Sequence, residues 1–474
     1  RDDEQIDIIC NDPAEPTFDN TIVRVDDEKN HYYDLLDRST TIFFNLLSAE
    51  TNDEMDELAQ KMSPILTKHA NDVRLNTVLF ERIKHVYDAY HNAEAEPERK
   101  LTAEENTLLE KCYDGFVRSG ALLDEAGKEK LRQLSEEGSM LSLQFSQNLM
   151  HDTNNTYVIV DSRSELEGLS EDNIQKAAQL ASRIGKEGKF AFNMQRPSCN
   201  PVLQYCSNRE LRKKVYLMYN DRCNHGDQYD NKAIAAEIIR LRTRKAQIMG
   251  YTDYAASQLG TKMAENAANV YNLLDQVWTP AVAKAQEEIA DIKAMMKADK
   301  VKGQPQRWDY MYYLDKAKKA KYNIDESEIS EYLEINAVQQ GIFYVANKLY
   351  GLSFRERTDE YPVYEKTAKS WDVIDKDGNV IAIFYSDYFP RDGKGAGAWM
   401  SNLRAQGYTT DENGKEIRVI PIVQNVLNMT KASSSRPALQ NMDNVETMFH
   451  EFGHALHFML HDVHYNATYN VETD

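Results

Sequence analysis

The chain has 474 residues and a formal net charge of −20, with 56 lysine and arginine residues against 76 aspartate and glutamate residues. This balance excludes a nucleic-acid partner, because binding to phosphates requires clustered positive charge. No run of about 18 apolar residues occurs, which excludes a membrane-spanning helix. The five cysteines are odd in number and scattered, so they form no disulfide framework.

The chain is predicted to be mainly helical up to about residue 360. Apolar residues recur at three-and-four spacing in two amphipathic helices, one marked by Leu131, Leu134, Gly138, Leu141, Phe145 and Leu149 and the other by Ile234, Ile238, Leu241 and Ile248. At ~150 residues per domain, a chain of this length forms two or three lobes. We therefore divide it into an N-terminal helical region, residues 1–155, and a second region, residues 156–474, that holds the candidate site.

The pattern changes from helix to strands at about residue 371. The dipeptide Asp377-Gly378 lies between two apolar runs, which is a hairpin signal. A second turn signal, Asn413-Gly414, precedes a further apolar run. We therefore predict a small sheet over about 371–426. An edge strand of such a sheet can hold an extended peptide by main-chain hydrogen bonds.

A glycine-rich loop lies within the predicted sheet region. Gly393, Gly395 and Gly397 fall within five positions, which predicts a flexible loop. It lacks the strand-to-helix context and the Lys-Ser or Lys-Thr of a phosphate-binding loop, so we treat it as a candidate peptide-contacting loop. The nearby Arg391 and Lys394 are either solvated, as exposed loop charges usually are, or available to a substrate carboxylate.

The strongest helical signal lies near the end of the chain, over about residues 444–461. One predicted face is apolar and consists of Val445, Met448, Phe449, Phe452, Leu456, Met459 and Leu460. The opposite stripe faces water or a cleft and consists of Glu446, His450, Gly453, His454, His457 and His461. Asp443, with Glu446 three positions later, predicts a capping box at the start of this helix.

This helix carries an H-E-x-x-H run, which is typical of zinc hydrolases. His450 and His454 lie one turn apart, so that both imidazoles reach one ion about 2 Å away and leave room for a third ligand and a water. Glu451 lies between them, where it can take a proton from the water and pass it to a leaving amine. The competing interpretation is a surface helix that contains two histidines by chance.

The residues after the motif narrow the class of zinc site. A three-histidine site would have a glycine and a third histidine where this chain has His457 and Leu460, so that class is excluded. The third ligand is then expected to be a carboxylate further along the chain. The acidic residues left after the motif are Asp462, Glu472 and Asp474, and none lies in a clear helical pattern.

Residues 449–457 are similar to the F-H-E-F-G-H-x-x-H run of the thimet oligopeptidase family of zinc metallopeptidases, which includes oligopeptidase A and the bacterial peptidyl-dipeptidases. Residues 384–389 and 397–400 resemble the peptidyl-dipeptidase version of the segment before the site. Near the start, residues 16–21 and 116–121 resemble that branch too. These flanking motifs are individually weak and collectively specific.

The resemblance implies a fold and an activity. The implied fold is mainly α, a large multi-helix peptidase fold that encloses a deep channel, with a small β-sheet next to the zinc helix. A channel excludes folded proteins, so the implied activity is zinc-dependent hydrolysis of peptide bonds in short peptides, with release of C-terminal dipeptides. Internal cleavage by an oligopeptidase of the same family is the alternative. We expect a monomer, soluble in the cytoplasm or, if a signal preceded Arg1, in the periplasm.

The resemblance also implies a set of site residues. One zinc ion per chain is bound by His450 and His454, and Glu451 is the catalytic residue. The third ligand of the family is the glutamate of an Asp-Phe-Val-Glu stretch, and this chain ends at Asp474 on what resembles the Asp of that stretch. We therefore expect the third ligand beyond it, with Glu472 as the competitor within the chain, and the catalytic region to be incomplete at its C-terminus. An alternative of another class is a catalytically silent peptide-binding fragment, because two histidines alone hold zinc weakly.

Overall fold

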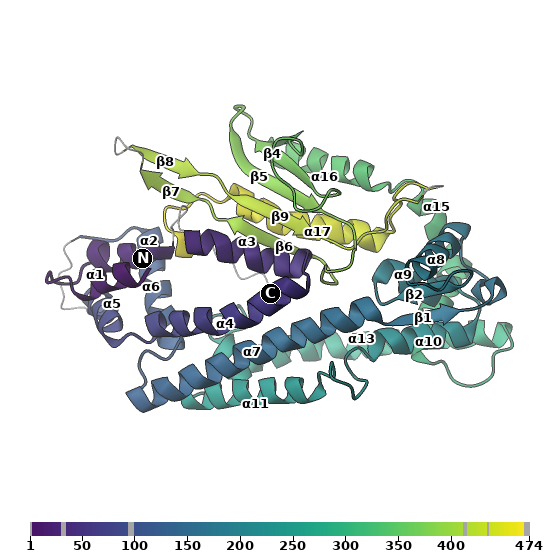
Figure 1. The fold of residues 1–474 in the computed structure, drawn as a ribbon, viewed down its shortest axis with the longest axis horizontal. Coiled ribbons are helices and arrows are strands. Elements are labelled where there is room, and N and C mark those ends of the chain that lie inside the picture. The colour runs from purple at the N-terminus through teal and green to yellow at the C-terminus, as the bar shows by residue number, and fades with distance from the viewer. Residues whose placement is uncertain (1, 30–34, 93–98, 411–414, 434–435, 469–474) are drawn as a thin grey trace.

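The N-terminal region is a group of helices that ends in one long helix (Figure 1). The computed structural model describes residues 2–29, 35–92, 99–410, 415–433 and 436–468. Its first elements are α1 (Asp2–Cys10), η1 (Phe18–Val23), α2 (Arg24–Lys29), α3 (Leu35–Ala49), α4 (Asp53–Arg74), α5 (Thr77–His91), α6 (Ala103–Arg118) and α7 (Glu125–Asn155). Helix α7 ends at the boundary that we placed between residues 1–155 and 156–474, a division that stays a prediction.

The middle of the chain is also mainly helical, as predicted up to about residue 360. Its elements are β1 (Tyr157–Val160), η2 (Arg163–Leu166), α8 (Glu171–Arg183), β2 (Phe190–Asn193), α9 (Arg196–Tyr205), α10 (Arg209–Asn220), α11 (Lys232–Ile248), α12 (Tyr254–Leu259), α13 (Ala267–Ala298), η3 (Arg307–Asp309), α14 (Tyr310–Tyr322), α15 (Glu326–Ser330) and α16 (Ile335–Tyr350). Strands β1 and β2 pair antiparallel. The two amphipathic helices that the apolar spacing predicted are α7 and α11.

Helix α7 runs diagonally through the molecule, with α4 and α11 packed along it (Figure 1). The Asp124 side chain caps its start by accepting a hydrogen bond from the Gly127 amide at 2.7 Å. Of the apolar residues that predicted this helix, Leu131 is buried, whereas Leu149 is only half-buried. The C-terminal part of α7 is less covered because it lines a cavity.

A five-stranded sheet follows, within the region predicted at about 371–426 and with one further strand before it. The strands of this part are β3 (Ser353–Glu356), β4 (Lys369–Ile374), β5 (Val380–Asp387), β6 (Trp399–Arg404), β7 (Gly407–Thr410), β8 (Glu416–Val419) and β9 (Ile422–Val426). The order β3-β4-β5-β9-β6 makes β6 an edge strand, and only the β5–β9 pair is parallel. Strands β7 and β8 form a separate hairpin, whose predicted turn at Asn413-Gly414 lies outside the described residues.

The predicted turn at Asp377-Gly378 joins β4 and β5, which pair antiparallel. Gly378 has a φ of +87°, in the left-handed region that favours glycine. The Asp375 carboxylate accepts hydrogen bonds from the amides of Asp377 and Asn379 at 2.9 and 2.8 Å. The Asp375 side chain therefore accepts the hydrogen bonds of turn amides in place of a backbone carbonyl, as aspartate commonly does in turns.

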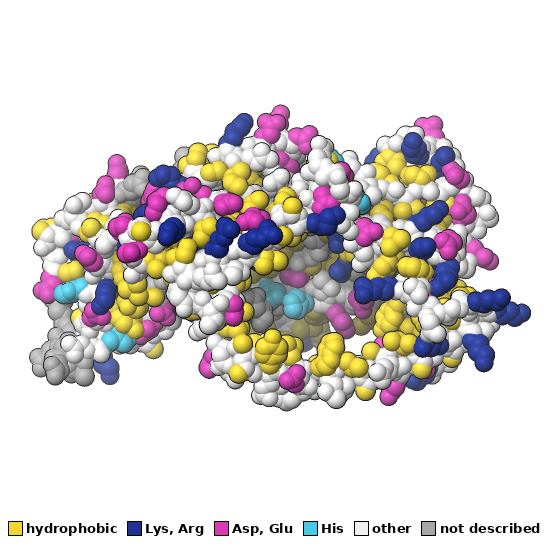
Figure 2. Space-filling model, turned by 90° about the horizontal axis from the view of Figure 1, so that it is seen from below, with side chains coloured by type: hydrophobic (Ala, Val, Ile, Leu, Met, Phe, Trp, Pro, Cys, Tyr) yellow, Lys and Arg dark blue, Asp and Glu magenta, His cyan; other side chains and the backbone are white. Residues whose placement is uncertain are grey.

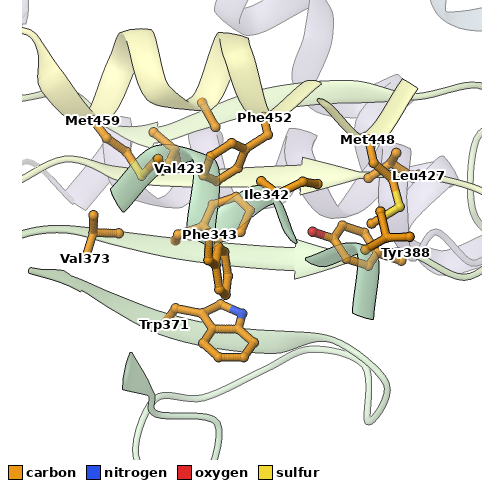
Figure 3. Packing of buried hydrophobic residues seen from close by; sticks show 14 of the residues in the cluster. Ile342, Phe343, Trp371, Val373, Tyr388, Val423, Leu427, Met448, Phe452 and Met459 are labelled. Atoms are coloured by element: carbon orange, nitrogen blue, oxygen red, sulfur yellow. The ribbon is translucent and has the colours of Figure 1, made fainter. Parts of the chain in front are cut away.

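Helix α17 (Met442–Leu460) packs across the sheet, close to the predicted range, and is followed by η4 (Asn466–Thr468). Figure 3 shows Met448, Phe452 and Met459 directed into a core that also holds Phe343 of α16 and Val423 of β9. The Phe452 and Phe343 ring centroids are 6.1 Å apart. Because this face of α17 is buried against the sheet, the opposite, polar face points away from the sheet.

Two details predicted for this helix are wrong. Phe449 and Leu460 are 39% and 36% exposed, because only the centre of the predicted apolar face meets the sheet. Asp443 is not the cap, since it already lies in the first helical turn. The cap is Asn441, which has extended backbone and accepts a hydrogen bond from the Asn444 amide at 2.9 Å.

The sheet and α17 form one layer, and the long helices α7, α11 and α13 form another below it (Figure 1). Figure 2, the view from below, shows a hollow with histidine side chains inside it and apolar side chains along its lower rim. The fold is therefore mainly α with a small sheet next to α17, as predicted, and it surrounds an open hollow. Among the residues that the structure describes, no helix is both long and apolar enough to cross a membrane.

Candidate metal centre

His450 and His454 face one another on the polar side of α17. Their Nε2 atoms are 3.1 Å apart, and the ring planes meet at 86°. His450 is exposed and His454 is half-buried. Glu446 and Gly453 of the same predicted stripe are exposed as well. The spacing of one helical turn thus brings two ring nitrogens toward one point outside the helix.

The geometry of this pair fits a zinc ion. Two nitrogens about 2.0–2.1 Å from a zinc ion at a tetrahedral angle are about 3.3–3.4 Å apart, close to the 3.1 Å between the Nε2 atoms of His450 and His454. Space is also available beside them. Among the described residues, no atom outside the helix lies within 4 Å of the position that a Cβ on Gly453 would take.

Glu451 lies beside the pair in different surroundings. Glu451 is only 8% exposed. Burial raises the pKa of this carboxyl above its usual range, and the nearby His450 and His454 act in the opposite direction. Among the described residues, only His450 and His454 act on this carboxylate through their charge.

The described residues supply two metal ligands. Among them, no group of three or more His, Cys, Asp or Glu side chains is placed to hold a metal. Asp462, the first acidic residue after the motif, accepts a hydrogen bond from Tyr408 at 2.8 Å and pairs with Arg418 at 3.2 Å. It is therefore engaged elsewhere. Glu472 and Asp474 lie outside the described residues.

The segment that follows α17 is held by the N-terminal helices. The Glu104 carboxylate of α6 accepts hydrogen bonds from the amides of His464 and Tyr465 at 2.7 and 3.1 Å. Asp26 of α2 accepts one from the Ala467 amide at 3.0 Å, across 441 positions of sequence. Residues of α2 and α6 therefore direct the segment that follows α17 away from this helix. No sequence signal points to these contacts.

Two cavities meet at the loop before β6. The larger has a volume of about 780 Å³ and is lined by residues of α8, α9 and α15 and by Asn444 and Thr447 of α17. The smaller has a volume of about 560 Å³ and is lined by residues of α3, α4 and α7 and by Trp399 of β6. Thr153 and Ala396 line both. We call the larger one the polar cavity and the smaller one the apolar chamber.

The charges of the glycine-rich loop are neither solvated nor available to a substrate, contrary to both predictions. The Lys394 ammonium pairs with the Asp387 carboxylate at 2.8 Å, with both side chains fully buried. Arg391 pairs with the same carboxylate at 2.8 Å. Burial alone raises the pKa of Asp387, but the hydrogen bond from Arg391 and the charge of Lys394 outweigh it and hold this pKa below its usual value.

The glycine-rich loop was predicted to be flexible, but it is hydrogen-bonded to the corner between α3 and α4. The Gly395 amide donates to the Ser48 carbonyl at 2.8 Å, and the Thr51 amide donates to the Gly393 carbonyl at 2.8 Å. Gly393 has a φ of +78°, and a Cβ there would lie 2.4 Å from the Thr51 carbonyl oxygen. Only glycine fits this contact.

The chain is similar in sequence to known peptidases. The pattern of peptidase family M3 matches residues 202–474. The chain is 32% identical over 454 residues to the dipeptidyl carboxypeptidase of Escherichia coli K12, covering 96% of this chain and 64% of that protein. It is 29% identical over 431 residues to oligopeptidase A of Salmonella typhimurium, covering 90% and 62%. The chain thus spans less than two thirds of the length of either relative.

A solved structure from Bacillus anthracis, named only provisionally as an oligoendopeptidase F, covers 96% of this chain and 63% of its own. Its TM-score is 0.46 at 12% identity, which is too low to carry an argument about the site.

Proposed function

The chain belongs to peptidase family M3, the family that residues 449–457 predicted, and from this premise we propose that it hydrolyses peptide bonds in short peptides with one zinc ion per chain. One observation carries the proposal. The Nε2 atoms of His450 and His454 lie 3.1 Å apart beside the buried carboxylate of Glu451. The polar cavity reaches Thr447, one turn before His450, so a peptide has access to this end of the helix.

Each side chain of the motif has one task in the proposed reaction. His450 and His454 hold the metal as neutral imidazoles through Nε2. Zinc, when bound, supplies a Lewis acid that lowers the pKa of a water to about 7 and polarises a carbonyl group. Glu451 accepts a proton from the attacking water while the water oxygen bonds to the carbonyl carbon. As the C–N bond breaks, Glu451 gives this proton to the amine nitrogen. The new carboxylic acid then loses its own proton to the amine, so the products are a carboxylate and an ammonium group.

We propose that the substrate is held in extended form along β6. This strand is paired on one side only, with β9, among the strands that the structure describes. Its free edge presents main-chain donors and acceptors that an extended peptide can pair with. Such pairing selects peptides by backbone and length more than by side chain.

The proposed subclass is the removal of dipeptides from the C-terminus. The relative named dipeptidyl carboxypeptidase is 32% identical over 96% of this chain, against 29% over 90% for oligopeptidase A. Internal cleavage by an oligopeptidase remains the alternative. Mass spectrometry of the products from a decapeptide separates them, because successive loss of C-terminal dipeptides is expected and cuts at internal bonds alone would favour the alternative.

We propose that a glutamate beyond Asp474 is the third zinc ligand, with Glu472 as the competitor. A second candidate function is a silent peptide-binding fragment, favoured by the two ligands that the described residues supply. Zinc content per chain and peptide hydrolysis, measured on the same preparation, separate the two. Hydrolysis that stops on chelation and returns with zinc supports the peptidase, whereas peptide binding without product supports the silent fragment.

The role of Glu451 gives the sharpest test. Glu451→Gln keeps the shape of the side chain but removes the proton carrier, so kcat/KM should fall by about 10²- to 10⁴-fold while zinc content is unchanged. Glu446→Gln is the matched control, because Glu446 is exposed on the same stripe of α17 and takes no part in the proposed reaction. Full activity in Glu451→Gln would contradict the mechanism.

A further inference from the structure

The apolar chamber has no role in the chemistry described so far. Its volume of about 560 Å³ falls in the range of ligand sites, which is roughly 300–1,000 Å³. Its apolar walls come from three separate elements and include Phe44, Leu47, Leu149, Met150 and Trp399. Each of these side chains is only half-buried. Filling the chamber with an apolar group would therefore remove apolar surface from water.

The lining of the chamber selects against acidic occupants. Of the described residues that line it, only Asp56 is charged, and its carboxylate accepts a hydrogen bond from the Thr51 hydroxyl at 2.8 Å. No lysine or arginine of the described lining is present to receive a carboxylate. An acidic group or a peptide C-terminus would be desolvated there without a partner, which is costly. A bulky uncharged side chain is the occupant that this chemistry fits.

The chamber is continuous with the path proposed for the peptide. Trp399 is the first residue of the edge strand β6, so a peptide paired along that edge passes the chamber mouth. Thr153 and Ala396 line both the chamber and the polar cavity. The polar cavity in turn reaches Thr447 of α17. One substrate can therefore occupy the chamber with a side chain while its backbone runs toward the metal helix.

The part of the chamber wall that the glycine-rich loop forms is closely packed and hydrogen-bonded. A Cβ on Gly395 would lie 3.2 Å from the Ser48 carbonyl oxygen and 3.5 Å from the Trp399 ring, so the backbone is packed between them. The Asn428 amide group donates to the carbonyls of Gly395 and Gly397 at 2.9 and 2.8 Å. A wall held on both sides is preorganised, which favours discrimination between side chains over adaptation to all of them.

We propose that the apolar chamber is a specificity pocket that receives one bulky uncharged side chain of the peptide, such as phenylalanine, leucine or methionine. The inference rests on the proposed function, because it takes a peptide to be the ligand. It adds a side-chain preference at one position to the backbone recognition supplied by β6.

The test is a binding experiment that does not require turnover. Alanine-based hexapeptides with one phenylalanine moved through every position are titrated calorimetrically into the Glu451→Gln protein. Phenylalanine at one position should lower Kd by about tenfold or more relative to alanine, as expected for an apolar group entering a fitted pocket. Glutamate at that position should give no gain.

Two variants of α7 test whether the gain in affinity for phenylalanine arises in the apolar chamber. Ser146 is exposed on the chamber wall, so Ser146→Trp should fill the chamber and abolish the gain. Ser142 is exposed one turn earlier on the same helix and does not line the chamber, so Ser142→Trp should leave the gain unchanged. Phe44→Ala, which enlarges the chamber, should move the preference from phenylalanine toward tryptophan.

The outcomes separate this inference from the proposed function. Equal affinity for phenylalanine at all positions, or a gain that survives Ser146→Trp, would overturn the pocket. Selective binding without hydrolysis by the unsubstituted protein would leave the pocket in place and overturn the peptidase. Hydrolysis without any side-chain preference would support the peptidase and overturn the pocket.

Discussion

Three consecutive residues of α17 meet three different environments. His450 is exposed, Glu451 is 8% exposed beside it, and Phe452 is 4% exposed in the core. Successive side chains turn by about 100° around a helix axis, so neighbours in sequence point to different sides. One short run thus supplies the proposed ligand, the proposed proton carrier and a core residue.

Removing the Asp387 carboxylate should be strongly destabilising. Asp387→Asn leaves Lys394 buried without its counter-charge, so we expect a loss of about 3–5 kcal/mol in the free energy of unfolding, measured by urea denaturation. Asp392→Asn is the control, because that side chain is 63% exposed and pairs with Arg183 only at 3.6 Å. It should cost less than about 1 kcal/mol. Equal effects would mean that the buried cluster does not hold the loop.

The pair formed by Glu105 and Arg99 should make stability depend on acid pH. Hydrogen bonds from Arg99, followed by that from the Thr102 amide, lower the pKa of Glu105 from 4.5 to about 2. The stabilisation is therefore complete above pH 4.5 and lost as the pH falls toward 2. Glu105→Gln should be less stable by about 1–2 kcal/mol at pH 7. Urea denaturation across this range should show the gap closing, and a gap independent of pH would contradict the assignment.

At the scale of the element, the orientation of α17 decides which of its aromatic residues matters for stability. Phe452 is 4% exposed, with its ring centroid 5.5 Å from that of Phe384, whereas Phe449 is 39% exposed. Phe452→Ala should cost about 3–5 kcal/mol by leaving a cavity. Phe449→Ala, one turn away on the same helix, should cost less than about 1 kcal/mol. Thermal unfolding of the two variants checks the difference, and a reversed order would mean that the helix is rotated.

The elements that sequence predicted well are those with local signals. The β4–β5 turn follows from Asp377-Gly378, and α17 follows from its apolar spacing. The cap at Asn441 and the exposure of Phe449 were missed because they depend on where the sheet lies. The hydrogen bond from the His464 amide to the Glu104 carboxylate joins residues 360 positions apart. Local sequence periodicity cannot predict such a contact.

At the scale of the whole molecule, α13 presents an uncovered apolar surface. Tyr271, Leu274 and Trp278 follow one stripe of this helix and are 65%, 53% and 70% exposed. Contiguous apolar surface of this kind is uncommon on monomers, so we expect self-association at high concentration and binding of a hydrophobic dye. Leu274→Lys with Trp278→Lys should reduce both, measured by sedimentation velocity and dye fluorescence. Ile65→Lys on α4 is the control, and a fully monomeric, dye-free protein would contradict the expectation.

The sequence predicts only the part of the candidate site that lies on one helix, α17. His450, Glu451 and His454 lie within two turns of α17, so their spacing alone indicates a shared task. Lys394 was misjudged because its buried partner, Asp387, lies at the end of β5, and no sequence pattern indicates that the loop folds back onto this carboxylate. The apolar chamber was invisible in sequence for the same reason, since its walls come from α3, α7 and β6.

The attachment of the segment after α17 to α2 and α6 has a consequence for how the protein is made. Synthesis proceeds from the N-terminus, so Asp26 and Glu104 leave the ribosome long before His464 and Ala467 reach them. The segment that follows α17 is therefore synthesised after the surface of α2 and α6 that it contacts. In synthesis, the proposed metal centre therefore comes after the helices that hold the segment next to it.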